Sequence, residues 1–339
     1  MHMRSNISGI PKLLGAFILL SLSLSACSPS RPFTLIISNP IDLQRINEGV
    51  TVSLDKAPAW ARKSDLILLD QAGKEIPHQR DDLNGDGKPD ELYFQVSLAP
   101  KESLPVQVIN GKSKKSKDSP FRVSVKQTML QVDTPTFLFK TTGPDDLQFF
   151  TASATTALLS AAYSTPQLIS KETQQRVLSQ GPLRVVLEQK TLWRTKDEVL
   201  VINHRFSFAL RDPLLRSTVQ KVRWPQAPDS APFSLEVESA NYRLKSFATR
   251  WLLEGANAKT VFPMAAVIYR AGNLVQPKSL AVLKDRWSQG FRAESSKVST
   301  AIMVGEINSQ TRVSPNNWDR QVERAQQRWL NPIEVLVAN

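Results

Sequence analysis

Cysteine and histidine are scarce in this chain, and their scarcity limits the chemistry available to it. There is one cysteine, Cys27, so no disulfide can form within the chain and stability must come from a hydrophobic core. Of the three histidines, only His78 and His204 lie beyond the first 30 residues, which excludes a zinc site built from several histidines. A serine-histidine-aspartate triad would have to use one of these two, and no nucleophile-elbow motif accompanies them.

Long apolar runs are also missing after the N-terminus. The run over residues 13–24 is too short to span a bilayer comfortably, follows the positive charges of Arg4 and Lys12, and leads into Leu-Ser-Ala-Cys at residues 24–27. This order is typical of a bacterial lipoprotein signal. It predicts cleavage before Cys27, lipidation of Cys27 and a membrane anchor of two or more acyl chains. The alternatives are an ordinary secretory signal with a chance cysteine and an uncleaved membrane anchor.

The chain carries an excess of positive charge. Lys and Arg number 43 against 31 Asp and Glu, which gives a formal net charge of +12. In a cell envelope this balance favours anionic partners such as lipopolysaccharide, acidic polysaccharide or a phosphorylated glycan. Nucleic acid is not expected as a partner in that location. A charged surface that serves only solubility is the alternative. Ser28 stands where an aspartate commonly retains lipoproteins in the inner membrane, so we expect the outer membrane.

The order of strand-like and polar segments predicts an all-β protein. Short alternating or β-branched segments separated by turns recur along most of the chain, whereas helical patterns are few. We expect a small β-barrel or β-sandwich followed by a large mutarotase-like β-supersandwich with one short C-terminal helix. The predicted divisions are a signal peptide (1–26), a tether (27–33), a small β-domain (34–110), a lysine-rich linker (111–120) and the supersandwich (121–339). A long hairpin tip within one domain is the alternative to the linker.

The helix is predicted near the C-terminus, where apolar residues recur at helical spacing over residues 317–330. Asn331 and Pro332 end it, and residues 333–337 resemble a last strand that returns to a sheet. Residues 151–162 are rich in alanine, threonine and serine and fit either a helix or a bent strand.

The sharpest motif is the loop over residues 82–91, which reads D-x-N-x-D-G-x-x-D and ends in a second acidic residue. Oxygen ligands at every second position suit a structural calcium ion. An EF-hand is excluded because Tyr93 stands where that motif has glutamate, and the flanking residues are strand-like. A polar hairpin turn without an ion is the alternative. The predicted ligands are the side chains of Asp82, Asn84, Asp86 and Asp90 and the main-chain carbonyl of Lys88.

His204 lies within a strand-like run, residues 199–210. Strand alternation predicts that it shares one face with Ile202 and Phe206, while Asn203 and Arg205 point to the other. This placement fits a core histidine better than a catalytic one, and both interpretations stay open.

Four segments have a familiar pattern when taken together: residues 37–43, 66–79, 82–91 and 179–186. They contain N-P-x-D, D-x-x-G-K-E-I-P-x-Q, the acidic loop and G-P-x-R, and Trp318 with Asn331-Pro332 adds a closing W…N-P pattern. Together they resemble the bacterial domain-of-unknown-function 4861 family, which is associated with polysaccharide utilisation. A weaker likeness links the first domain to the β-domain that precedes the supersandwich of exo-acting rhamnogalacturonan lyases.

The resemblance implies a place in the degradation of acidic, uronate-containing glycans, with lyase or dehydratase-type elimination as the reaction. Elimination beside a uronic carboxylate needs a base, a cation to stabilise the developing negative charge and a proton donor. Four residues are candidates for these tasks: Arg184 as neutralising cation, His204 as base or acid, Arg205 as second cation and Tyr242 as proton donor. Residues 189–316 depart from the family pattern, so two alternatives stay open: a non-catalytic lipoprotein that binds glycan or protein, and a structural factor of outer-membrane assembly.

Overall fold

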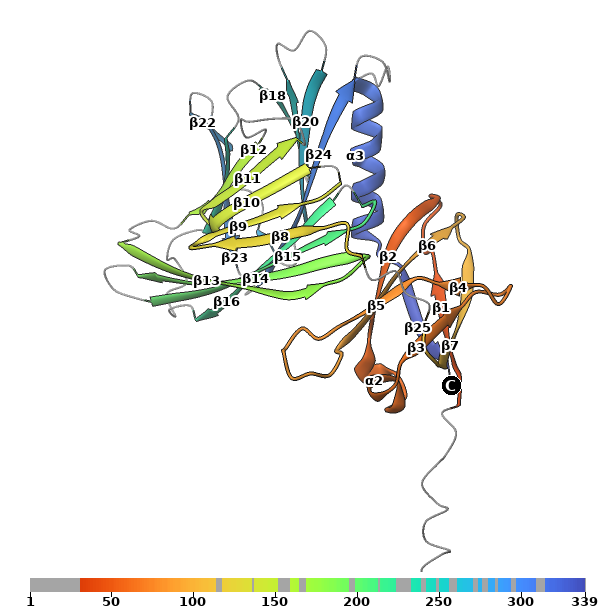
Figure 1. The fold of residues 1–339 in the computed structure, drawn as a ribbon. Helices are drawn as coiled ribbons and strands as arrows, with labels where there is room; N and C mark the ends of the chain where they lie inside the picture. The colour runs from red at the N-terminus through yellow and green to blue at the C-terminus, as the bar shows by residue number, and fades with distance from the viewer. Residues whose placement is uncertain are drawn as a thin grey trace, which may run out of the picture.

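The computed structural model describes residues 31–113, 118–135, 137–151, 159–164, 169–194, 199–212, 214–223, 233–238, 242–247, 250–255, 261–270, 274–275, 280–283, 286–293, 297–308 and 315–338. Side chains are described in these segments up to residue 218 and from residue 320, apart from residues 151, 159, 161–164 and 200. As predicted, the protein is mostly β-structure with a short C-terminal helix. The described strands pair antiparallel in four sheets, and none of these sheets closes into a barrel (Figure 1).

Two sheets form the N-terminal unit. The five-stranded sheet has the order β25 (Glu334–Ala338), β1 (Phe33–Ser38), β7 (Ser103–Asn110), β3 (Leu66–Leu69) and β4 (Glu75–Ile76). The three-stranded sheet consists of β2 (Arg45–Ser53), β6 (Glu91–Leu98) and β5 (His78–Asp81). A 3-10 helix (Leu54–Lys56) and α2 (Trp60–Lys63) connect β2 to β3. Alternate residues of β1, Phe33, Leu35 and Ile37, are buried and pack into the apolar core of this unit.

Two larger sheets form the second unit. One has the order β21 (Leu274–Val275), β23 (Arg286–Ala293), β17 (Phe233–Glu238), β12 (Leu159–Ser164), β11 (Asp146–Thr151), β10 (Phe137–Gly143), β9 (Met129–Asp133) and β8 (Arg122–Lys126), with β22 (Leu280–Leu283) beside β23. The other has the order β13 (Ser170–Gln180), β14 (Arg184–Arg194), β15 (Val199–Ala209), β16 (Leu214–Arg223), β24 (Lys297–Asn308), β20 (Val261–Arg270), β19 (Arg250–Gly255) and β18 (Tyr242–Phe247). The ambiguous residues 151–162 are strand wherever they are described.

Phenylalanine side chains join the two large sheets. The Phe139 ring lies 5.1 Å from the rings of both Phe149 and Phe206 and 5.3 Å from that of Phe208, measured between ring centroids. Phe139 and Phe149 belong to one sheet and Phe206 and Phe208 to the other, so the inner face of β15 is the face that carries the core. The opposite face of β13–β16 is therefore turned away from the second sheet.

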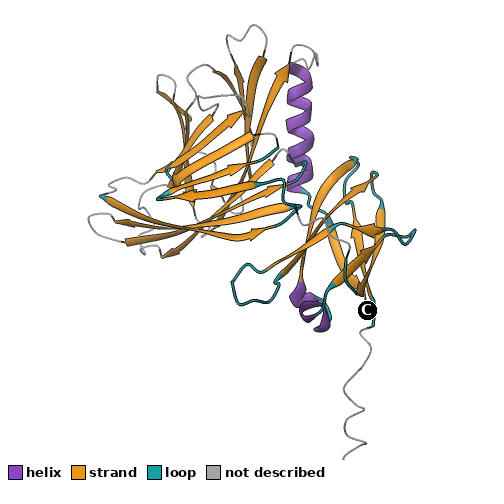
Figure 2. Cartoon of the chain, viewed as in Figure 1, coloured by secondary structure: helices purple, strands orange, loops and turns teal. Residues whose placement is uncertain are grey.

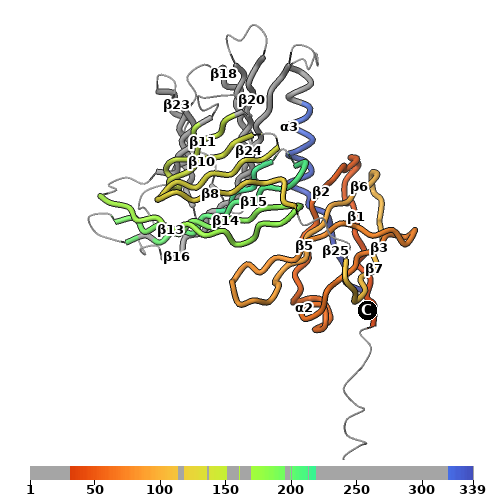
Figure 3. Tube along the Cα trace, in the orientation of Figure 1, coloured from red at the N-terminus to blue at the C-terminus, as the bar shows by residue number. Residues whose placement is uncertain are grey.

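The predicted C-terminal helix is α3 (Pro315–Leu330), and the chain then returns to the N-terminal unit. Strand β25 pairs with β1, in register from Thr34 opposite Ala338 to Ser38 opposite Glu334. Figures 2 and 3 show this path from the helix down to the first strands. No helix among the described residues has the length and apolar character needed to cross a membrane. The expected domain boundary at residues 111–120 stays a prediction, since 114–117 lie outside the described residues.

A buried arginine fixes the end of α3 to the N-terminal unit. Arg45 is fully buried, and its Nε donates to Oδ1 of Asn39 at 2.8 Å. Its two terminal nitrogens donate to the carbonyl oxygens of Arg328, at 3.4 Å, and Asn331. These carbonyls belong to the last helical turn and the residue after it, where a cation also interacts favourably with the helix dipole.

A second buried cluster, which we call the junction, joins the two units through Gln79, Asp81 and Arg184. Gln79 Oε1 accepts the main-chain N–H groups of Leu183 (3.0 Å) and Arg184 (2.9 Å), and its Nε2 donates to the Arg184 carbonyl at 3.1 Å. Nε2 also donates to Asp81 Oδ1 at 2.6 Å, while Arg184 Nε donates to Asp81 Oδ2 at 2.6 Å. Gly181 fits here because a Cβ would lie 2.5 Å from Gln79 Oε1.

Replacing Gln79 by leucine is expected to destabilise the protein by roughly 3 kcal/mol or more. The N–H groups of Leu183 and Arg184 would lose their side-chain partner in a buried site, and each such group costs about 1–3 kcal/mol. Urea unfolding of Gln79→Leu measures the loss. Gln71→Leu, on an exposed turn, is the matched control, and an equal change in both variants would contradict the importance of the junction.

Candidate functional site

Of the four residues that the sequence suggested for elimination chemistry, the structure brings two together and places a third elsewhere. Arg184 and Arg205 both line one cavity between the two units. His204 is fully buried in the sandwich core, on the opposite face of β15 from Arg205. The Tyr242 side chain lies outside the described residues. The two arginines are therefore brought together, and His204 is not part of their site.

The cavity that holds the two arginines has a volume of about 220 Å³, and we call it the inter-domain cavity. Its walls come from β2, the acidic loop and β6 on one side and from the outward-facing residues of β14–β16 on the other. Its lining consists of Thr51, Leu83, Glu91, Tyr93, Arg184, Val186, Arg205, Ser207, Ala209, Asp212, Leu214 and Arg216.

Arg184 is fully engaged inside the inter-domain cavity. Besides its contact with Asp81, it donates to Glu91 Oε2 at 2.6 Å and Thr51 Oγ1 at 3.2 Å, and its guanidinium stacks 4.4 Å above the ring centroid of Tyr93. Its side chain is only 6% exposed. Burial raises the pKa of Tyr93 to about 12, so its phenol stays protonated at neutral pH. Arg184 is thus a structural tie between the units, with little of its charge open to a ligand.

Arg216 is held at the other side of the inter-domain cavity. It forms ion pairs with Asp212 at 2.8 Å and Glu48 at 3.4 Å. Burial acts to lower the pKa of Arg216, but the two carboxylates outweigh it and the net change is upward. The guanidinium is therefore charged throughout the physiological range and links the β15–β16 turn to β2.

Arg205 differs from these two because it is half exposed and lies in a row of charges across three strands. The register places Arg176 of β13 opposite Glu188 of β14, and Glu188 opposite Arg205 of β15. Glu188 accepts from Arg176 at 3.0 Å and from Arg205 at 3.5 Å. One carboxylate thus stands between two guanidiniums that are 53% and 47% exposed, and we call these three residues the charge row.

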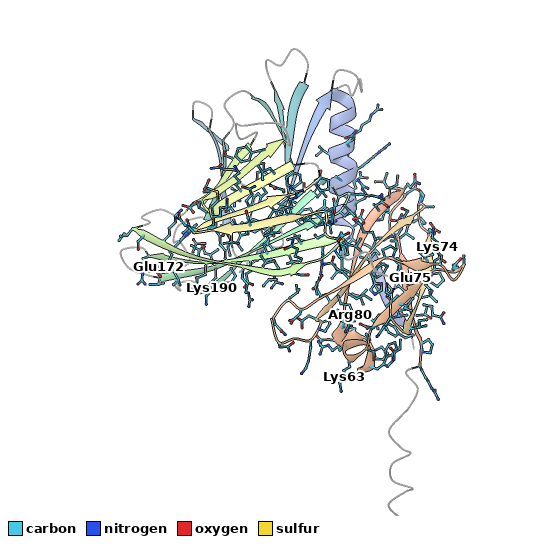
Figure 4. The ribbon with its side chains drawn as sticks, viewed as in Figure 1. Lys63, Lys74, Glu75, Arg80, Glu172 and Lys190 are labelled. Atoms are coloured by element: carbon cyan, nitrogen blue, oxygen red, sulfur yellow. The ribbon has the colours of Figure 1, made fainter. Side chains whose placement is uncertain are left out.

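A second and larger cavity adjoins the charge row on the same outward face of the sheet. Its volume is about 790 Å³, within the range usual for small-ligand sites, and we call it the outer groove. Figure 4 shows Lys190 on this side of the sheet, away from the sandwich interior. The outer groove is lined by Gln174, Gln175, Arg176, Glu188, Lys190, Val201 and Asn203.

Sequence reasoning found Arg205 but missed Arg176, Glu188 and Lys190. Alternation along β14 does indicate that Glu188 and Lys190 point outward, because Val185, Leu187 and Gln189 are the buried positions. The pairing of Glu188 with Arg176 needed the β13–β14 register, which shifts between Val177 and Ser179 and so cannot be counted back from the turn.

His204 behaves as the core histidine that alternation predicted. Ile202, His204 and Phe206 are all buried, whereas Arg205 faces outward. The His204 ring lies 3.9 Å from the Phe206 ring between centroids, and its Nε2 and the Ser217 hydroxyl oxygen are 2.5 Å apart. Burial lowers the pKa of His204 to about 3, so the ring is neutral at physiological pH.

The acidic loop is closed by hydrogen bonds to its own main chain. Asp82 accepts the N–H groups of Gly85 and Gly87, both at 2.7 Å, and Asp90 accepts those of Leu83 at 2.8 Å and Asn84 at 3.2 Å. Gly85 and Gly87 adopt φ near +80°, which favours glycine. Slight desolvation acts to raise the pKa of Asp82, but the N–H donors outweigh it and lower this pKa.

The structure gives no direct sign of a metal in this loop. Among the residues described, no group of three or more His, Cys, Asp or Glu side chains is placed to hold a metal ion. Calcium binding by Asp82, Asn84, Asp86, Asp90 and the Lys88 carbonyl therefore stays a prediction. The loop does reach the charge row, because a Cβ on Gly85 would lie 4.0 Å from Nη1 of Arg176. Figure 2 shows it projecting from the N-terminal strands.

Comparison with known proteins supports the resemblance found in the sequence. Residues 37–166 match the family model described as Domain of unknown function (DUF4861). The stretch covers most of the N-terminal unit, without β25, and the first strands of the sandwich. No curated protein matches the chain by sequence. Lipidated Cys27, predicted from the signal, lies outside the described residues.

Two solved structures from Enterococcus faecalis share the fold. An alpha-mannosidase from strain V583 superposes with a TM-score of 0.60 at 9% identity, over 92% of this chain and 46% of that one. A protein in the Glycosyl Hydrolase Family 38 superposes with a TM-score of 0.57 at 9% identity, over 92% of this chain and 48% of that one. The chain thus spans about half the length of these neighbours, and its fold is one also found in proteins that act on carbohydrates.

The buried His204 predicts a specific pH dependence of stability. Its pKa is about 3 in the folded protein against an ordinary 6.5, so between these values only the unfolded chain takes up a proton. Stability therefore falls as the pH falls through this window, by about 1.4 kcal/mol per pH unit from this group. Urea unfolding of wild type and His204→Gln from pH 8 to 4 tests this: the variant should lose less stability on acidification, and parallel curves would contradict the burial.

Calcium binding predicts that the ion raises the melting temperature of the full chain in a concentration-dependent way, since a ligand that binds only the folded state stabilises it. Asp86→Asn and Asp90→Asn should abolish the rise, while magnesium at the same concentration should not reproduce it. An unchanged melting temperature with calcium would show that the loop closes through its own hydrogen bonds alone.

Proposed function

We propose that this chain, whose residues 37–166 match the DUF4861 family, is an envelope lipoprotein, anchored through Cys27 in the outer membrane, that binds acidic oligosaccharides in the outer groove. The observation that carries this proposal is the charge row, in which Arg176 and Glu188 line the outer groove while Arg205, paired with Glu188, lines the adjoining inter-domain cavity. The fold shared with carbohydrate-active chains and the basic composition support it.

The charge row suits a ligand with carboxylates. Glu188 holds both guanidiniums in position, yet it can neutralise only one positive charge, so the row keeps a net charge of +1. Both guanidiniums are about half exposed, and each contacts Glu188 through its Nη2 alone among the described residues, which leaves nitrogens for a planar two-point contact with a carboxylate. Lys190 adds a further positive charge beside them in the outer groove. A uronate-containing chain supplies negative charges that match this surface.

The remaining lining of the outer groove suits sugar hydroxyls. Gln174 and Asn203 are amides that both donate and accept, as a ring of hydroxyl groups requires, whereas the Gln175 amide donates to the carbonyl of Thr128. No aromatic residue among those described lines this cavity, so the contacts shown there offer hydrogen bonds and charge rather than stacking. The specificity expected is for acidic over neutral oligosaccharides of similar length.

We propose that the chain binds its ligand without catalysing an elimination reaction, because the geometry favours binding. Elimination needs a base and a proton donor beside the neutralising cation. His204 is buried on the opposite face of β15, and Arg184 is already paired with Asp81 and Glu91. Arg184 and Arg205 thus share a cavity without His204, and the Tyr242 side chain lies outside the described residues.

Arg205→Gln is expected to weaken binding of an acidic oligosaccharide roughly tenfold, because it removes one charge-assisted, two-point contact. Isothermal titration of the full chain in non-ionic detergent with tetragalacturonate measures this. Arg122→Gln, an exposed arginine on β8, is the matched control, and maltotetraose is the neutral ligand.

Three outcomes would overturn the proposal: no saturable binding of any acidic oligosaccharide, equal losses in the two variants, or equal affinity for the neutral ligand. Absorbance at the unsaturated-uronate band, followed in the same samples, separates binding from reaction. A rise in that absorbance would restore the elimination reaction as the function of the groove.

A further inference from the structure

A third cavity lies where α3, β2 and the β15–β16 turn meet, and the functions proposed above make no use of it. Its volume is about 250 Å³. We call it the arginine cavity, because three guanidiniums line it and a fourth lies against it. Figure 1 shows the lower end of α3 beside β2 at this place. It is lined by Ile46, Asn47, Glu48, Arg211, Asp212, Leu214, Arg216, Ala325 and Arg328.

Glu48 is the centre of the charges in the arginine cavity. Its carboxylate lies 3.7 Å from Arg45, 3.4 Å from Arg216 and 3.9 Å from Arg328. A single negative charge is thus shared by three guanidiniums. Asp212 adds a second carboxylate, which pairs with Arg216 at 2.8 Å.

Arg211 raises the positive charge further. It lies in the β15–β16 turn with φ near +60°, is exposed, and forms no ion pair with any other residue that the structure describes. The charged residues in and against the cavity, which we call the cluster, have an excess of two positive charges. Its members are the four cations Arg45, Arg211, Arg216 and Arg328 and the two carboxylates Glu48 and Asp212. Burial lowers the pKa of Arg45 most, Glu48 opposes this, and the neighbouring guanidiniums of Arg328 and Arg216 lower it further. The cluster is therefore short of negative charge.

The donors of the cluster are also incompletely used. The Nε atom of Arg216 is buried and has no hydrogen-bond partner among the described residues. Arg45 is committed to Asn39 and to the carbonyls at the end of α3, so its charge also offsets the negative end of the helix dipole. Arg211, Arg216 and Arg328 are left as the donors that face the cavity.

From this arrangement we infer that the arginine cavity binds a phosphoryl group, carried as a phosphomonoester or as free phosphate. A phosphomonoester carries close to two negative charges at neutral pH, which matches the excess of two positive charges. Its oxygens accept several hydrogen bonds at once from guanidinium groups, whereas a carboxylate offers one charge and two oxygens. Ile46, which is largely exposed at the rim, offers apolar contact to whatever carries the phosphate.

Phosphate binding is tested by isothermal titration of the full chain in non-ionic detergent with inorganic phosphate, at constant ionic strength set with chloride. Arg211→Gln is the informative variant, because Arg211 has no internal ion pair among the described residues whose loss could disturb folding. Saturable binding to wild type and a loss of roughly tenfold in the variant are expected. Arg122→Gln should bind phosphate as wild type does.

Further ligands identify the source of the phosphate. Glucose 6-phosphate represents a soluble sugar phosphate, and phosphatidylcholine vesicles with and without phosphatidate represent a lipid headgroup. Binding of either that depends on Arg211 supports the inference and names the source. Three results would overturn the inference. They are no saturable phosphate binding, an equal loss of affinity in Arg211→Gln and Arg122→Gln, and glucuronate binding as tight as that of phosphate. Arg205→Gln should leave the affinity for phosphate unchanged. The oligosaccharide proposal and the phosphate inference can therefore be disproved separately.

Discussion

The buried junction of Gln79, Asp81 and Arg184 is the contact on which the arrangement of the molecule depends. A buried arginine and carboxylate are costly to remove from water and become stable only when their remaining donors and acceptors are also satisfied. Here Gln79 supplies those partners by bonding both the carboxylate and the main chain at the start of β14. The junction thereby holds β5 and β6 against the outer face of β14–β16, and the inter-domain cavity exists because of that placement.

Alternation along single strands divides the polar residues of this protein into two classes. On β15, His204 faces the core and is neutral, while its neighbour Arg205 faces outward, lines the inter-domain cavity and is charged. The pattern was readable from sequence because strand alternation depends only on the chain's own geometry. Residue type alone, however, suggested that His204 and Arg205 act in one site. They cannot do so, because adjacent residues of a strand point to opposite faces.

Local patterns predicted what is local in this fold. The helix ending before Asn331, the strand after it and the burial of His204 all follow from spacing and flanking residues. Pairings between distant segments had no such signal: β25 joins β1, and Gln79 meets Leu183 and Arg184 more than a hundred residues away. The motifs of the family resemblance, I-P-x-Q and G-P-x-R, contain these partners, but only the structure shows that they touch.

The outer groove and the arginine cavity share one physical design. In each, a partly buried carboxylate contacts more than one guanidinium, Glu188 with two and Glu48 with three. Such a carboxylate fixes long, flexible side chains in place, which lowers the entropy lost when a ligand binds, yet it cannot neutralise them all. The result in both places is a positive field that is already ordered. The difference in excess charge, one in the charge row and two in the arginine cavity, is what separates a surface suited to carboxylates from one suited to a phosphoryl group.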